Sequence, residues 1–236
     1  RVKEGWAGMR SMSMWTEAMT QARKVKHALF ESDLTPDVKL DWVKFSPDED
    51  LGERWQTASD SAWGGMSSCS LEVTGDGLGV FKGAISLELP PPHLETGFLY
   101  GSTTKQATKA GMCGFTSKRD ALHSNLEHCN ALKIKLKGDG RVYLVNLRTE
   151  ALRQGDLYQT LIKPEAGEWK ELLLPFGNFQ LTHYGMINVN GVKMNPRTVV
   201  SFGVTIQDGK EGPFELQIDS VSAVRDLSLP ELEQDC

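Results

Sequence analysis

Turn-forming residues interrupt most of this sequence so often that few long helices fit into it. From Pro36 onward, short segments rich in Val, Leu, Ile, Phe and Trp alternate with clusters of Gly, Pro, Asn and Asp. Segments of this length and composition, bounded by turn residues, are typical of β-strands. We predict about nine strands, and they lie at residues 66–74, 79–89, 111–118, 130–137, 141–148, 156–163, 168–175, 199–206 and 213–224.

Several of these segments alternate between apolar and polar residues. Leu132–Leu136 and Phe214–Ile218 would each bury every second side chain. The Gly75–Gly77 and Asp139–Gly140 turns predict tight hairpins, each joining the strands on either side of it. Short strands without intervening helices predict an all-β fold, a two-sheet β-sandwich of the jelly-roll kind.

The first part of the chain has a different pattern. Between Val2 and Leu29, apolar residues recur at spacings of three or four, which predicts an amphipathic helix ending before Pro36. Residues 1–30 hold six basic and two acidic residues, a charge of +4, so the −5 of the whole chain leaves −9 for the rest. We therefore divide the chain into a basic helical arm at 1–35, a sandwich domain at 36–226 and an acidic tail at 227–236, with an insertion loop at 90–110 inside the domain.

The arm is also the best candidate for partner contact. Methionine is adaptable and tryptophan is a frequent interface anchor, so we expect a helix-in-groove contact or a peripheral contact with a membrane surface. The alternative is an arm that packs back on its own sandwich. The side chains proposed for partner contact in the arm are Trp6, Met9, Met12, Trp15 and Met19.

Composition excludes several classes of protein. Hydrophobic residues make up 39% and charged residues 24% of the 236 positions, which argues against intrinsic disorder. A net acidic chain is a poor general binder of nucleic acid. No apolar run approaches the roughly 18 residues of a membrane-spanning helix. The four cysteines are widely spaced, which favours a reducing compartment, and no targeting peptide is visible after Arg1.

None of the polar clusters has the spacing of a catalytic or metal site. The cluster from His123 to Cys129 lacks paired ligand spacing and has no second cluster to accompany it. The glycines of Gly75–Gly79 are followed by a strand and not by the helix of a phosphate-binding loop. The carboxylates of Asp48–Asp50 are neighbours in a polar loop, so they cannot oppose each other across a substrate. We expect no enzymatic activity, no cofactor and no metal.

One set of motifs is more specific. Residues 59–71 read S-D-x-x-x-G-G-x-S-x-x-x-L, and further blocks follow in order along about residues 42–224. These blocks are Phe81–Ser86, Gly114–Lys118, Leu136–Asn146, Trp169–Phe179, Ser201–Gly203 and Gly212–Asp219. Taken in this order, they resemble the family of complex I intermediate-associated protein 30. The 90–110 loop is longer than the family pattern, and Trp63 stands where a smaller aliphatic residue is common.

The resemblance implies a galactose-binding-like jelly roll and a function without chemistry. Mitochondrial members of the family are assembly factors, that is, chaperones or scaffolds that bind membrane-arm intermediates of respiratory complex I at the matrix side of the inner membrane. The implied partners are complex I subunits and other assembly factors. Retention as an accessory subunit of the finished complex is a further reading. The alternative from a different class is a carbohydrate-binding module, for which Tyr100, Tyr143, Tyr158 and Tyr184 are the candidate platform residues.

Most motif residues are expected to maintain the fold. Gly64 and Gly65 would allow a turn with positive φ, and Asp60 could accept hydrogen bonds from the amides of that turn. Arg141 would be free to pair or to contact a partner, so it joins the partner-binding candidates. The positions assigned to the motif are Asp60, Gly64, Gly65, Ser67, Gly138, Asp139, Gly140, Trp169, Pro213 and Asp219.

Overall fold

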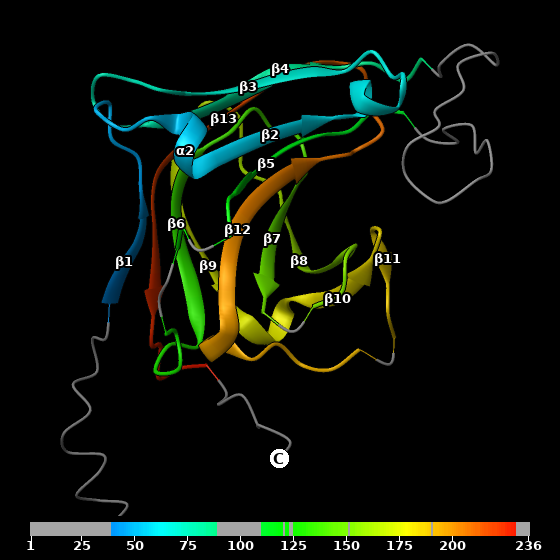
Figure 1. Ribbon diagram of the computed structural model, residues 1–236. Coiled ribbons are helices and arrows are strands. Elements are labelled where there is room, and N and C mark those ends of the chain that lie inside the picture. Colours follow the sequence, from blue (N-terminus) through cyan, green and yellow to red (C-terminus); the bar gives the residue numbers. More distant parts are fainter. Residues whose placement is uncertain are drawn as a thin grey trace, which may run out of the picture. The chain divides into compact units, whose positions relative to one another are not determined.

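The computed structural model describes residues 39–88, 110–119, 121–122, 125–150, 152–189 and 191–229. The predicted helical arm at 1–35 and most of the 90–110 loop and of the acidic tail lie outside these residues. Lys39–Cys236 form one compact unit. Within its described residues the dominant element is the antiparallel β-strand (Figure 1).

The strands form two sheets. The six-stranded sheet has the order β3-β4-β13-β6-β9, and β1 also pairs with β13. The seven-stranded sheet has the order β11-β10-β8-β7-β12-β5-β2. The first sheet is built from β1 (Lys39–Lys44), β3 (Ser68–Val73), β4 (Gly79–Ile85), β6 (Ala131–Lys137), β9 (Trp169–Pro175) and β13 (Gly212–Val224). The second is built from β2 (Trp55–Ser59), β5 (Cys113–Ser117), β7 (Tyr143–Thr149), β8 (Asp156–Ile162), β10 (Gln180–His183), β11 (Met186–Ile187) and β12 (Val199–Ile206).

Helical structure in the described residues is short. The elements are α2 (Leu51–Arg54) and three 3₁₀ turns, η1 (Asp60–Trp63), η2 (Phe176–Asn178) and η3 (Pro196–Thr198). Asp50 caps α2 by accepting a hydrogen bond from the Gly52 amide at 2.8 Å. These turns join strands and leave the fold an all-β sandwich of the jelly-roll kind, as the sequence predicts.

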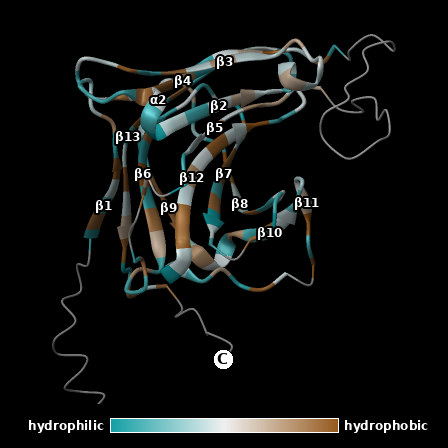
Figure 2. Cartoon of the chain, in the orientation of Figure 1, coloured by the Kyte–Doolittle hydropathy of each residue, from teal (hydrophilic) through white to brown (hydrophobic). Residues whose placement is uncertain are grey.

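The interior between the sheets is aromatic. Phe81 of the first sheet contacts Phe115 of the second at 5.0 Å between ring centroids, and Phe81 also contacts Phe214 at 4.9 Å. Trp55 packs against Phe115 at 5.6 Å and extends this row of rings. The strands alternate as the period of two requires, and hydrophobic and hydrophilic segments follow one another along them in Figure 2. Burial of this aromatic row is what holds the two sheets face to face.

One of the two predicted hairpins is confirmed and the other is wrong. Val73 pairs with Gly79, so the Gly75–Gly77 turn does join two neighbouring strands of one sheet. At Asp139–Gly140 the chain instead leaves the first sheet and enters the second, because β6 pairs with β9 and β13 while β7 pairs with β8 and β12. The turn residues there serve a crossover between sheets.

Candidate functional site

The motif residues at the start of the domain meet around one buried carboxylate. Asp60 accepts hydrogen bonds from the Ser67 amide at 2.9 Å and from the Ser67 hydroxyl at 2.8 Å. It also accepts from the amides of Gly111 at 2.5 Å and Met112 at 3.2 Å. The side chain is 2% exposed. Asp60 therefore fastens the start of β5 to the segment before β3, and it does not bond the amides of its own turn as the sequence suggests.

The two glycines beside Asp60 have different reasons to be glycine. Gly64 has φ of +87°, in the left-handed region, as predicted. Gly65 has no positive φ, but a Cβ there would lie 2.4 Å from Cγ of Asp60. The main chain itself closes the turn, because the Gly65 amide donates to the Asp60 carbonyl at 3.0 Å.

The second group of motif residues surrounds Arg141. The guanidinium donates to both carboxylate oxygens of Asp208, at 3.1 Å from Nε and 2.6 Å from Nη2. It also donates to the carbonyl oxygens of Lys210, Gly212 and Pro213, the last two at 3.0 Å. Arg141 is 9% exposed. The sequence leaves Arg141 free to pair or to contact a partner, and the structure shows that it pairs: its donors bond Asp208 and three main-chain carbonyls of the same chain.

Asp139 completes this group from the crossover. One carboxylate oxygen accepts from the Arg141 amide at 3.0 Å, and the other accepts from the Tyr143 hydroxyl at 3.0 Å and from the Glu215 amide at 2.8 Å. Gly140, with φ of +84°, allows the change of direction between the sheets. The Gly138–Arg141 motif thus ties the crossover to the start of β13.

The electrostatics of the Arg141–Asp208 pair are those of an internal ion pair. Burial, the largest single effect, raises the pKa of Asp208, but the hydrogen bonds from Arg141 and from the Lys210 and Val142 amides, together with the charge of Arg141, outweigh it and hold that pKa below its usual range. The pKa of Arg141 is raised in turn by the Asp208 carboxylate. The pair is therefore charged at neutral pH and serves the fold.

The remaining motif residues lie on the outer face of the six-stranded sheet. Trp169 is 42% exposed, with the Lys135 ammonium 5.8 Å from its ring centroid. Lys135 also pairs with Asp219 at 3.4 Å. Pro213 is exposed on β13. Lys133, Lys135 and Lys137 alternate along β6, so this face carries charges in an ordinary solvated arrangement.

The outward face of the seven-stranded sheet has a different character. The strand registers place six residues without charge in a single line across β10, β8, β7, β12, β5 and β2. We call this line the amide row. Its members, in order, are Gln180, Gln159, Asn146, Gly203, Thr116 and Gln56.

Hydrogen bonds between side chains preorganise the amide row. The Asn146 side-chain amide donates to the Thr205 hydroxyl at 2.8 Å, and the Gln159 side-chain amide donates to Oδ1 of Asn146 at 2.7 Å. The Thr182 hydroxyl donates to Oε1 of Gln159 at 2.8 Å. Asn146 is only 7% exposed although it faces away from the core, while Gln180 and Gln56 at the two ends of the row are exposed. The middle of the row is therefore set in place and its ends remain open to a ligand.

Apolar side chains flank the amide row on both sides, and we call them the apolar flanks. On one side Leu161 pairs with Leu144, and on the other Thr182 pairs with both Leu157 and Ile187. Leu161 is 67% and Ile187 is 64% exposed. Large aliphatic side chains this exposed beside an ordered polar line are typical of a recognition surface. We take the amide row and its apolar flanks as the candidate binding surface.

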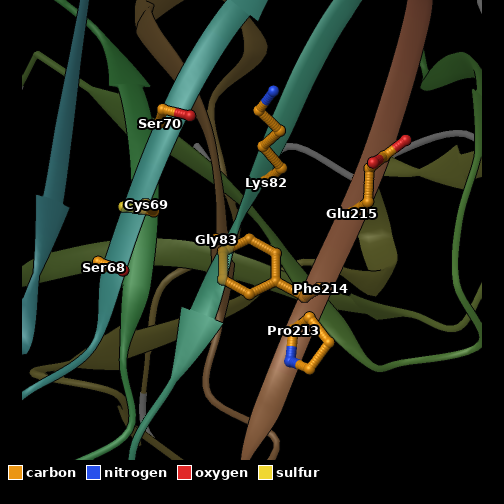
Figure 3. Close-up of a pocket in the computed structure, with 8 residues that line it drawn as sticks. All are labelled: Ser68, Cys69, Ser70, Lys82, Gly83, Pro213, Phe214 and Glu215. Atoms are coloured by element: carbon orange, nitrogen blue, oxygen red, sulfur yellow. The ribbon is translucent and has the colours of Figure 1, made fainter.

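A separate hollow of about 530 Å³ lies on the six-stranded sheet, over β3, β4 and β13 (Figure 3). Gly83 has no room for a side chain, since a Cβ there would lie 2.0 Å from the Ser68 carbonyl oxygen. The hollow is lined by Ser68, Cys69, Ser70, Lys82, Gly83, Pro213, Phe214 and Glu215.

The described residues form neither a metal-binding cluster nor a membrane-spanning helix. Within the part of the chain that the structure describes, His, Cys, Asp and Glu side chains do not gather in threes around a point where a metal could sit. In those same residues, helices are too short and too polar to cross a membrane. The predicted contact residues of the arm, from Trp6 to Met19, lie outside the described ranges.

Sequence reasoning missed the candidate binding surface. The available signal was the chemistry of the outward positions: β6 places lysines there, whereas β7, β8 and β12 place Asn146, Gln159 and Thr205. The row itself could not be found in this way, because it depends on the register between strands that are distant in the sequence.

Comparisons with known proteins agree with the motif blocks. The sequence profile of the family described as complex I intermediate-associated protein 30 matches residues 43–218. A Drosophila melanogaster protein named "Complex I intermediate-associated protein 30, mitochondrial" is 30% identical over 76% of this chain and 61% of its own length. The Mus musculus protein of the same name is 28% identical over 78% of this chain and 55% of its own length. The chain thus spans about half to three fifths of the relatives it matches.

The solved structures that match this chain include carbohydrate-binding modules. A family 11 module from Clostridium thermocellum covers 80% of this chain and 98% of its own, with a TM-score of 0.49 and 13% sequence identity. A family 29 module covers 81% of this chain and 91% of its own, with a TM-score of 0.41 and 12% identity. The profile match covers most of the sequence, including all three groups of motif residues apart from Asp219. The chain belongs to the complex I intermediate-associated protein 30 family.

Proposed function

We propose that this protein is a non-enzymatic assembly factor of mitochondrial respiratory complex I. It binds intermediates of the membrane arm at the matrix side of the inner membrane and holds them until later modules arrive. The observation that carries this proposal is the match of residues 43–218 to the family, with relatives that are named mitochondrial. Its partners are complex I subunits and other assembly factors.

The use of the polar groups supports a binding role without chemistry. The buried carboxylates of Asp60 and Asp208 and the guanidinium of Arg141 are each saturated by bonds within the chain. Groups held in this way fix the fold and have no free proton or lone pair to offer a substrate. What the sandwich presents outward is the amide row with its apolar flanks.

This surface suits a protein segment. Exposed Leu161 and Ile187 would anchor apolar side chains of the partner, while Gln180 and Gln56 at the ends of the amide row offer donors and acceptors to its main chain. The surface has few charges, so its binding should depend little on salt. We assign the complex I intermediate to this face.

Charging the apolar flanks tests the assignment. In cells that lack the native protein, the L161D/I187D variant should reduce co-migration with complex I intermediates on native gels by about tenfold or more, because a buried apolar anchor is replaced by a desolvated charge. Since both side chains are exposed, the free energy of unfolding should change by no more than about 0.5 kcal/mol.

The matched control is L227D, which charges a leucine of similar exposure, 66%, outside the seven-stranded sheet. It should co-migrate as the wild type does. Equal co-migration of L161D/I187D and wild type would remove this face from the proposal, and absence of the wild-type chain from every complex I intermediate in a complexome profile would refute the proposed function itself. Presence in the finished complex as well would mark the protein as a retained accessory subunit.

The helical arm is proposed as a second contact. Removing residues 1–30 should leave the sandwich folded, because Lys39–Cys236 form a compact unit, and should abolish co-migration with complex I intermediates. The readout is the same native gel, with the far-ultraviolet circular dichroism spectrum as the check on folding. Undiminished co-migration of the folded, shortened chain would show that the arm is dispensable.

The carbohydrate alternative gains no support from the tyrosines. Tyr143 and Tyr158 are buried in the core, and Tyr100 lies outside the described residues. Tyr184 is exposed, which leaves one described tyrosine in place of the coplanar set that a sugar platform needs.

A further inference from the structure

The fold brings together two cysteines that are distant in the sequence. Cys69 is on β3 of the six-stranded sheet, and Cys113 is on β5 of the seven-stranded sheet. The Cys69 thiol donates to the Ala58 carbonyl at 3.5 Å and lies 3.9 Å from the carbonyl oxygen of Gly114, the residue after Cys113. Both thiols are free. The pair therefore faces across the sandwich from one sheet to the other.

The two members of the pair differ in exposure. Cys113 is fully buried, whereas Cys69 is partly exposed on β3, which stands at one end of the six-stranded sheet. An oxidant can therefore reach Cys69 more easily than Cys113.

The pKa values of the two thiols also indicate that Cys69 reacts before Cys113. The pKa of Cys69 is lowered because Cys113 donates a hydrogen bond to it, which outweighs the effect of burial. The pKa of Cys113 is raised by that same bond and by burial. Since the thiolate is the reactive form, Cys69 is the nucleophile of the pair and Cys113 the proton-bearing partner.

We propose that Cys69 and Cys113 form a peroxide-sensitive dithiol that closes into a disulfide between the two sheets. The Cys69 thiolate attacks one oxygen of hydrogen peroxide, the O–O bond breaks, and a sulfenic acid forms as hydroxide leaves and takes up a proton to become water. The Cys113 sulfur then attacks the Cys69 sulfur, the S–O bond breaks, and the released hydroxide combines with the Cys113 proton as a second water. Two thiols are oxidised to one disulfide, and one peroxide is reduced to two waters.

The disulfide would link β3 to β5 covalently. In the reduced protein these strands are held together by packing and by the hydrogen bonds of Asp60. A disulfide would also restrict the unfolded chain, and it would thereby stabilise the folded state. Reduction by a dithiol would restore the two thiols. Cys129 is the internal comparison, because burial raises the pKa of its thiol and the structure gives it no neighbouring cysteine among the described residues.

The experiment treats the full-length reduced protein with hydrogen peroxide, blocks remaining thiols with an alkylating agent, and identifies linked peptides by mass spectrometry. We expect a Cys69–Cys113 peptide pair lighter than the two thiol peptides by two hydrogen atoms, lost again after treatment with dithiothreitol. The melting temperature of the oxidised protein should rise by several degrees. Both effects should vanish in C69S and persist in C129S.

A second set of measurements labels the thiols chemically. In the folded wild type, a thiol-reactive bimane should label Cys69 at least about tenfold faster than Cys129 because Cys69 is the exposed and more acidic thiol. In C113S, dimedone should trap a sulfenic acid at Cys69, which has lost its resolving partner. A folded protein that gives no Cys69–Cys113 link with peroxide, or that labels Cys129 as fast as Cys69, would overturn the proposal.

Discussion

Replacing Asp60 by alanine should lower the free energy of unfolding by about 3 to 5 kcal/mol, because it leaves several buried donors without an acceptor at once. The carboxylate of Asp60 serves the amides of Ser67, Gly111 and Met112 and the Ser67 hydroxyl. Alanine would leave all four unpaired and open a space beside Gly65. The measurement is equilibrium unfolding in urea followed by the fluorescence of buried Trp42 and Trp55.

Two variants control this result. D76N changes an exposed aspartate in the turn between β3 and β4 and should alter stability by no more than about 0.5 kcal/mol. D60N keeps the size of the side chain but directs an amide donor at other donors, so it should recover only part of the loss. If D60A were as stable as D76N, the role of Asp60 as the fastening point between β3 and β5 would be wrong.

Replacing Arg141 by alanine should also cost about 3 to 5 kcal/mol, because it leaves the buried carboxylate of Asp208 without its counter-ion. The guanidinium further bonds the carbonyls of Gly212 and Pro213, where β13 begins. R141K keeps the charge but lacks the planar set of guanidinium donors, so its free energy of unfolding should be well below that of wild type. Unfolding in urea gives the free energy of unfolding of wild type, R141A and R141K.

The matched control is R153A, which removes an exposed arginine and should have a free energy of unfolding close to that of wild type.

The dependence of stability on pH provides a second check. The folded-state pKa of Asp208 is lowered, so the stability that it contributes is present above about pH 4 and is lost as the pH falls through the folded-state value. The difference in free energy of unfolding between wild type and R141A should therefore become smaller in acid. A difference that stays constant down to pH 2 would contradict the proposed role of the ion pair.

These two expected results change how the family motifs are understood. Residues that the resemblance groups by sequence prove to be fastening points of the sandwich: Asp60 holds the start of β5, and Asp139 and Arg141 hold the crossover against β13. A buried, saturated polar group is intolerant of replacement for reasons of stability alone. Loss of function in such variants would therefore not by itself identify a binding site, whereas variants of the exposed apolar flanks would.

The strands of the core could be predicted because burial on one face imposes a period of two. Ala131–Lys137 and Gly212–Val224 show this alternation and were placed within a few residues. The strands that were missed, β1, β2, β10 and β11, contribute few buried side chains or are very short. Their place in a sheet depends on the neighbour that supplies the hydrogen bonds, and a single sequence contains no direct sign of that neighbour.

The sequence by itself determined the alternation of the strands, the turn positions and, through the ordered motifs, the family. It could not decide which strands share a sheet, since a glycine-rich turn such as Asp139–Gly140 permits both a hairpin and a crossover. The tertiary structure decided that, and with it everything that depends on contacts between distant strands. The amide row needs the register of six strands, and the Cys69–Cys113 pair needs two sheets face to face. The physical reason is that local preference acts along the chain, whereas register and facing of sheets are selected by burial of the shared core.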